Sequence, residues 1–234
     1  MNWTEISSIR GWLTRREGKF LYRLAGNVPD NGVIVEIGSY EGRSTVCLAK
    51  GIKHNAKVYS IDPHTRWCRR YNEIGTGERF LSNMRNSGVG DRVVPIFDYS
   101  YNAARKWYRH INLLFIDGSH DEDSVTRDFK LFFPFVAYGG WIVLHDTTSS
   151  LLHRLPGYAG PRRAADKLMF LASSVGRIVT VDTITAGQKE FNVGPETRMR
   201  NLHVRLRKVP SDLLSVLLNM VMRLANIGQG GSDE

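Results

Sequence analysis

The chain has 234 residues, of which 42% are hydrophobic and 24% are charged. This composition is sufficient for one large domain with a buried core and excludes a disordered chain. Lysines and arginines (32) outnumber aspartates and glutamates (23), which gives a formal net charge of +9. Such an excess fits a solvated basic surface equally well as binding to nucleic acid, an anionic membrane surface or an anionic substrate. No apolar run reaches the length of a membrane span, and no signal-peptide pattern is visible. We therefore expect a cytoplasmic protein.

The first thirty residues are predicted to be helical. Apolar side chains recur at three- and four-residue intervals from Trp3 to Leu13, and again from Phe20 to Ala25. Turn-forming residues at 27–32 end this pattern. We expect three parts: N-terminal helices at 1–30, a central domain at 31–194 and a C-terminal appendage at 195–234.

The stretch from Val33 to Thr45 has the pattern of a strand, a tight turn and the start of a helix. Gly38 follows an apolar strand, and Gly42 comes four positions later. Such a unit lets the backbone approach a ligand closely and directs free helix N–H groups at it. The G-x-x-x-G spacing differs from the dinucleotide fingerprint, so an NAD site is not indicated.

Four more predicted strands end in polar or acidic residues. They cover 57–61, 92–97, 111–116 and 141–144, and are followed by Asp62, Asp98, Asp117 and the pair His145 and Asp146. Nearly continuous apolar strands indicate a parallel sheet that is buried on both faces. Ligands bind at the carboxyl ends of such strands, where Asp62 is well placed to accept the ribose hydroxyls of an adenosine cofactor. Segments at 177–182 and 189–193 flank a predicted turn at 186–188.

Together, the glycine turn and the strand ends resemble class I S-adenosylmethionine (SAM) methyltransferases. Glu36, two positions before Gly38, and Tyr40 and Ser44 after it match the first motif of catechol-type and natural-product or sugar O-methyltransferases. The resemblance covers about 31–193. It implies an α/β, Rossmann-like, doubly wound sheet of about seven strands with an antiparallel last hairpin. The cofactor-binding residues it implies are Glu36, Gly38, Ser39, Tyr40, Gly42, Ser44, Asp62, Asp98 and Asp117. For Asp98, capping of the following helix is an equally good interpretation.

The resemblance also implies a catalytic cluster. In metal-dependent relatives, the ligands of a divalent cation such as Mg²⁺ or Mn²⁺ would correspond to Asp117, His145 and Asp146. His120 stands where catechol-type enzymes have a lysine base, and its reference pKa suits a base at neutral pH. His145 departs from the family, which usually has a carboxylate there, and imidazole suits Mn²⁺ better than Mg²⁺. Two alternatives remain open. One is a metal-free site in which His120 or His145 is the base and Asp146 orients it. In the other, Asp146 caps a turn and His145 is only a strand-end residue.

The appendage is predicted to contain a basic strand and an apolar helix. Leu202, Val204 and Leu206 alternate with basic residues at 198–208. Residues 212–227 form a helix pattern that is apolar over most of its circumference and therefore has to be buried. We expect it to pack on its own domain or in a homo-oligomer interface. The alternative is a peripheral helix on a membrane surface.

The predicted function is methyl transfer from SAM to a hydroxyl of a small molecule, such as a sugar, a polysaccharide component or another natural product. Two rivals remain. The net charge and the Arg-rich loop at 66–71 favour an RNA or protein methyltransferase, but no Asn/Asp-Pro-Pro-Tyr motif is present, so nucleic acid is not the expected partner. The second rival is a non-catalytic SAM-binding subunit.

Overall fold

The computed structural model describes residues 1–53, 55–64, 67–68, 73–74, 76–147 and 160–206. The predicted helix at 212–227 lies outside these residues, so the structure does not test it. Among the described residues, none of the helices has both the length and the apolar character needed to cross a membrane.

A seven-stranded sheet forms the centre of the fold, with the strand order β5-β2-β1-β6-β7-β9-β8. The first five strands in this order are parallel: β5 (Val93–Ile96), β2 (Lys57–Ile61), β1 (Val33–Ile37), β6 (Ile111–Ile116) and β7 (Val136–Leu144). β9 (Ile184–Lys189) runs antiparallel to both β7 and β8 (Val175–Val181). The predicted doubly wound sheet with an antiparallel last hairpin is confirmed. Pro95 lies on the edge strand β5, where its missing N–H leaves no gap in a ladder.

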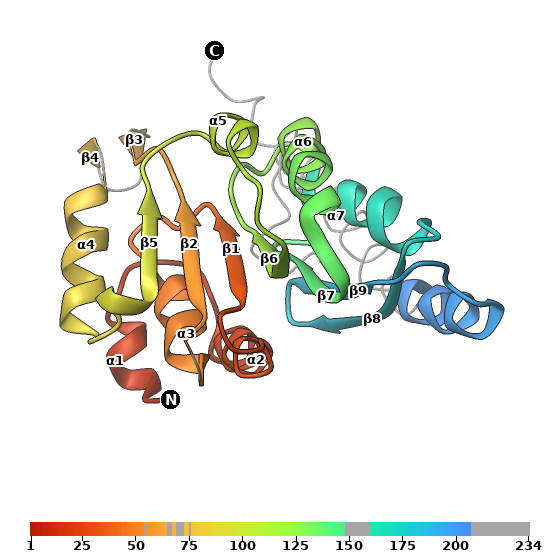
Figure 1. Ribbon diagram of the computed structural model, residues 1–234, viewed down its shortest axis with the longest axis horizontal. Helices are drawn as coiled ribbons and strands as arrows, with labels where there is room; N and C mark the ends of the chain where they lie inside the picture. The colour runs from red at the N-terminus through yellow and green to blue at the C-terminus, as the bar shows by residue number, and fades with distance from the viewer. Residues whose placement is uncertain (54, 65–66, 69–72, 75, 148–159, 207–234) are drawn as a thin grey trace, which may run out of the picture.

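Helices cover both faces of this sheet (Figure 1). One face packs against α1 (Trp3–Ser7), α2 (Arg15–Ala25), α3 (Arg43–Gly51) and α4 (Gly77–Asn86). The other packs against α5 (Ser100–Arg105), α6 (Glu122–Phe132) and α7 (Gly160–Ala165). Ile6 and Leu21 of the N-terminal helices are fully buried in the same core cluster as Ile34 of β1. The N-terminal helices therefore share the hydrophobic core of the sheet.

The carboxyl ends of the central strands are held side by side by backbone hydrogen bonds. Gly38 N donates to Ile61 O at 2.9 Å, Asp117 N to Ile37 O at 2.8 Å, and His145 N to Ile116 O at 3.1 Å. These bonds extend the parallel ladders by one residue beyond each strand. They bring the residues after β1, β6 and β7 to one edge of the sheet.

Three local predictions are wrong. The first helix ends at Ser7, and Gly11, with a φ of +154°, lies in the connection to α2. The Arg-rich segment at 66–71, predicted as a loop, contains the short strand β3 (Trp67–Cys68), which pairs with β4 (Glu73–Ile74). The hairpin turns at Asp182 and Thr183 rather than at 186–188, because Asp182 adopts the left-handed conformation that the turn needs. Gly187 lies inside β9, where a Cβ would be 2.7 Å from Val175 Cγ1.

The predicted strand at 198–208 is also wrong, since residues 195–206 are helical. Three alternating apolar positions fit a strand, but the segment is rich in arginine, methionine and leucine, which favour helices. Tertiary contacts reinforce the helix. The buried Asn201 accepts a hydrogen bond from Ile178 N (3.2 Å) and donates one to Val175 O (3.3 Å), which fixes the helix to β8.

Candidate active site

The turn after β1 contains two glycines, Gly38 and Gly42, at positions where a side chain would not fit. Gly38 has a φ of +85°, and a Cβ there would lie 2.5 Å from Gly118 Cα and would also collide with the Asp117 carbonyl oxygen. Gly42 has a φ of +93°, and its Cβ would strike Met84 and Phe80 of α4. Positive φ values and these close approaches both require glycine. The turn thus delivers the first residues of α3 to the edge of the sheet.

The side chain of Glu36 stabilises this turn through hydrogen bonds. The side chain is fully buried, and its carboxylate accepts hydrogen bonds from Ser44 Oγ (2.5 Å), Thr45 Oγ1 (2.5 Å) and Ser60 Oγ (3.1 Å). Burial raises the pKa of Glu36 to about 7, although the three hydroxyl donors act in the opposite direction. These contacts give Glu36 and Ser44 a structural role in joining β1, β2 and α3. Direct contact of either residue with a cofactor stays a prediction.

Asp62 lies directly beside the turn. Its Oδ2 accepts from the backbone N–H groups of Ser39 (3.0 Å) and Tyr40 (2.9 Å), and its Oδ1 accepts from His64 N (2.8 Å). Two carboxylate oxygens offer about four acceptor sites, so at least one remains for a ribose hydroxyl.

Tyr40 and His64 both adopt a positive φ, which costs a side-chain-bearing residue about 1–2 kcal/mol. Such strain is common at functional sites.

Asp98 lies farther along the same edge, after β5. Its Oδ1 accepts hydrogen bonds from Tyr99 N (2.7 Å) and Asn102 Nδ2 (2.8 Å) at the start of α5. These bonds lower the pKa of Asp98. Asp98 thus lies one residue before the N-cap Tyr99 and does not cap α5 itself, and its bond to Asn102 is compatible with the predicted cofactor contact.

Acidic and imidazole side chains gather at the ends of β6 and β7. Asp117, His120 and Asp146 each offer a ligand atom, and these three atoms lie within 4.8 Å of one another. His120 Nε2 is 3.0 Å from Asp146 Oδ2. His145 Nδ1 is 3.0 Å from Asp117 Oδ1 and 3.4 Å from Asp146 Oδ2. The structure therefore brings together all four residues predicted for catalysis or metal binding.

A fifth residue of this cluster comes from α2. Glu17 is fully buried, and its Oε2 lies 3.4 Å from His145 Nε2. Its Oε1 accepts from Thr183 N (2.9 Å) and Thr183 Oγ1 (2.7 Å). The capping-box pattern of Thr14 and Glu17 is visible in the sequence. That pattern predicts a helix start, but not the contact with a histidine 128 positions along the chain.

The charged side chains of the cluster shift one another's pKa values. Burial alone would lower the pKa of His145, but Asp117, Asp146 and Glu17 raise it well above its usual value. Burial would likewise lower the pKa of His120, and the contact with Asp146 raises it. For Glu17, burial favours a higher pKa, but the contacts with His145, Thr14 and Thr183 together lower the pKa to about 2. The three carboxylates around His145 thus favour its protonated form.

The connection between α1 and α2 is fixed to the glycine turn. Arg43 donates to the carbonyl oxygens of Ile9 (2.7 Å), Ser7 (3.1 Å) and Leu13 (3.3 Å). Arg10 Nη2 lies 2.8 Å from Oε1 of the buried Glu41. The half-exposed Trp12 ring lies 5.5 Å from the ring of Tyr40. Sequence patterns gave no signal for these contacts, which place an aromatic pair beside the turn.

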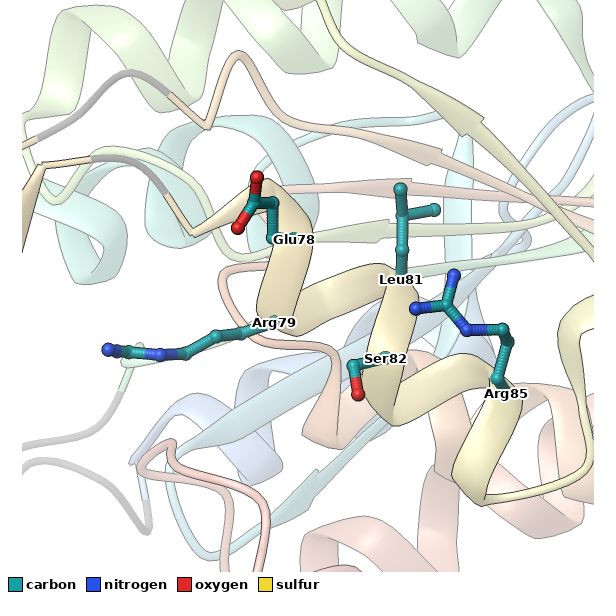
Figure 2. A pocket seen from close by; sticks show the side chains of 5 residues that line it. All are labelled: Glu78, Arg79, Leu81, Ser82 and Arg85. Atoms are coloured by element: carbon teal, nitrogen blue, oxygen red, sulfur yellow. The ribbon is translucent and has the colours of Figure 1, made fainter.

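A shallow surface hollow lies elsewhere, along α4 (Figure 2). Five side chains of this helix line it: Glu78, Arg79, Leu81, Ser82 and Arg85. None of them belongs to the predicted site. Arg79 reaches Glu41 of the glycine turn at 3.2 Å, so the hollow borders the turn without containing the catalytic cluster.

The residues present fit both an adenosine cofactor and a divalent cation, the two groups that the fold implies. The glycine turn, with Asp62 beside it, suits an adenosine cofactor, since the backbone is open to close approach and a carboxylate stands at the tip of β2. Two carboxylates and one imidazole in the Asp117, His120 and Asp146 cluster are a ligand set that suits Mn²⁺, Fe²⁺ or Zn²⁺ better than Mg²⁺.

Comparison with known proteins agrees with this geometry. Residues 35–147 match a family described as a methyltransferase domain. The uncharacterised protein R132 of Acanthamoeba polyphaga mimivirus is 28% identical over 123 residues, which cover 50% of this chain and 52% of that protein. The alignment therefore spans about half the length of this relative.

Two solved structures show the same fold. Cofactor-bound Rv0187 from MTB superposes with a TM-score of 0.62 at 20% identity, over 81% of this chain and 88% of that one. The O-methyltransferase TomG from Streptomyces achromogenes, solved in complex with SAM, gives a TM-score of 0.59 at 19% identity, over 76% and 82% of the two chains. Residues 35–147 thus match a methyltransferase domain, and the fold is that of class I methyltransferases, as the first motif predicted.

Proposed function

We propose that the protein transfers the methyl group of SAM to a hydroxyl of a small molecule, such as a sugar, a polysaccharide component or another natural product. The juxtaposition of the glycine turn and the His120–Asp146 pair carries this proposal. Asp117 N donates to Ile37 O, directly before the turn, so a cofactor at the turn lies next to the acid–imidazole cluster. TomG, which has the same fold, is an O-methyltransferase solved with SAM.

His120 is the proposed base. The Asp146 carboxylate lies 3.0 Å from Nε2 of His120. In the neutral imidazole the proton therefore stays on Nε2, and the lone pair is on Nδ1. The acceptor hydroxyl gives its proton to this nitrogen as its oxygen forms the new bond to the methyl carbon. SAM bound at the turn would supply the methyl group and would leave as S-adenosylhomocysteine (SAH), a neutral thioether. The side chain of His120 is 37% exposed, which lets the proton pass on to water. In-line positioning of the two reactants supplies much of the rate.

A cation-assisted version of the same reaction is the second candidate, favoured by the spacing of Asp117, His120 and Asp146. A divalent cation held by these residues would lower the pKa of the acceptor hydroxyl. We favour the base mechanism because both carboxylates already have an imidazole partner at 3.0 Å. These contacts already engage the carboxylate oxygens that a cation would need.

The test measures SAH formation by the purified protein with SAM and a panel of sugar and phenolic acceptors. We expect turnover that depends on the acceptor. Asp62→Asn should weaken SAH binding in calorimetry, while His120→Gln should retain SAH binding and lose turnover. If the wild-type protein binds SAH but transfers methyl to none of the acceptors, the alternative of a non-catalytic SAM-binding subunit gains support instead.

A further inference from the structure

Glu17 has an unusual position for a residue at the start of a helix. It belongs to α2, outside the matched region 35–147, yet its carboxylate is fully buried at the carboxyl end of the sheet. Buried carboxylates are costly unless they are paired and hydrogen-bonded. Glu17 meets both conditions. It accepts from Thr14 N (2.8 Å) and from Thr183, and it faces His145.

The contact between Glu17 and His145 is electrostatic and lacks hydrogen-bond geometry. Oε2 is 3.4 Å from Nε2, and neither ring nitrogen of His145 has an aligned hydrogen-bond partner among the described residues. The ring is therefore held by charge from two sides. Glu17 attracts Nε2 on one side, and Asp117 and Asp146 attract Nδ1 on the other. Phe115 adds an edge-to-face contact, with ring centroids 6.2 Å apart.

We infer that Glu17 is a positioning residue that orients the His145 imidazole, so that Nδ1 faces Asp117 and Asp146. His145 in turn fixes Asp146, the carboxylate that orients the proposed base His120. This inference rests on the proposed function. It assigns to the N-terminal helices a direct part in setting the geometry of the catalytic cluster, through a contact to α2. It also removes His145 from the candidates for the base, since its Nε2 faces a buried carboxylate and not an acceptor.

A mutant series separates positioning from stability. Glu17→Gln preserves the shape of the side chain and its acceptor oxygen for Thr183, but removes the charge opposite His145 together with the Oε2 acceptor of Thr14 N. We expect kcat to fall about 10-fold, with little change in the KM for SAM. The matched control is Thr14→Ala, which removes the hydroxyl that accepts from Glu17 N and donates to Asp182, but keeps the backbone N–H that donates to the Glu17 carboxylate. This control should lower the melting temperature and leave kcat unchanged.

A double-mutant cycle shows whether Glu17 acts through His145. In a His145→Gln background, adding Glu17→Gln should cause no further loss of kcat. If the two losses multiply instead, Glu17 acts independently of His145 and the inference is wrong.

A spectroscopic measurement needs no acceptor, so it remains decisive even if the proposed function fails. An imidazole N–H proton signal of His145 would be assigned by its loss in His145→Gln. Glu17→Gln should shift this signal, while Thr14→Ala should not. An unshifted signal in Glu17→Gln would overturn the inference, whatever the turnover of the wild-type protein.

Discussion

Replacing Gly38 by alanine tests the close approach of the glycine turn to β6. Two costs are expected. The φ of +85° places the new side chain in the left-handed region, at about 1–2 kcal/mol. The Cβ would also collide with the backbone of Asp117 and Gly118, which cannot rotate away, and overpacking of this kind costs about 1–3 kcal/mol more. We therefore expect Gly38→Ala to destabilise the protein by about 2–5 kcal/mol.

Gly139 provides a matched control. Its φ of +79° is nearly the same, but a Cβ there would meet nothing within 4 Å. Gly139→Ala should therefore cost only the conformational part, about 1–2 kcal/mol. Denaturant unfolding of both variants measures the difference, and calorimetry with SAH measures its effect on the site. Gly38→Ala should lose SAH affinity because the turn has to move, while Gly139→Ala should retain it. Equal destabilisation and equal SAH affinity of the two variants would refute the reasoning.

Three further predictions concern the titrating groups and the metal. If His120 is the base, kcat/KM should fall as the pH drops through a pKa raised above 6.5, and a flat profile would argue against it. Folding should raise the pKa of Glu36 from 4.5 to about 7, so the folded state holds an extra proton between these values. The contribution of Glu36 to the free energy of unfolding is then complete below pH 4.5 and is lost as the pH rises through 7. The loss is about 3 kcal/mol in denaturant unfolding, and it should be absent in Glu36→Gln. Treatment with a chelator should leave turnover unchanged; abolition of turnover, with recovery in Mn²⁺, would establish the cation-assisted candidate instead.

The sheet could be predicted from the sequence because its strands carry strong local signals. Each central strand is an apolar run that ends in a distinctive residue: Gly38, Asp62, Asp117 or His145. Parallel strands bring such ends to one edge, so the candidate site followed from the fold class. The positions of Asp117, His120, His145 and Asp146 agree with this expectation, while their roles stay predictions.

The misplaced elements had weak or ambiguous local signals. Three alternating apolar residues at 202–206 fit a strand, and only the docking of Asn201 on β8 shows why a helix is preferred. Gly187 suggested a turn, but it serves close packing against Val175. Glu17 was missed for another reason. Its capping box explains the residue completely at the local level, and no pattern in one sequence reports its long-range contact with His145.

Where the methyl group goes is the most direct test of the central claim. The protein would be incubated with SAM labelled in the methyl group, a panel of small hydroxyl acceptors, bulk RNA and a protein extract, and the labelled products would be separated. We predict label on an oxygen of a small acceptor, and none when Asp62→Asn replaces the wild-type protein. Label in RNA or protein, with none in any small hydroxyl compound, would contradict the account.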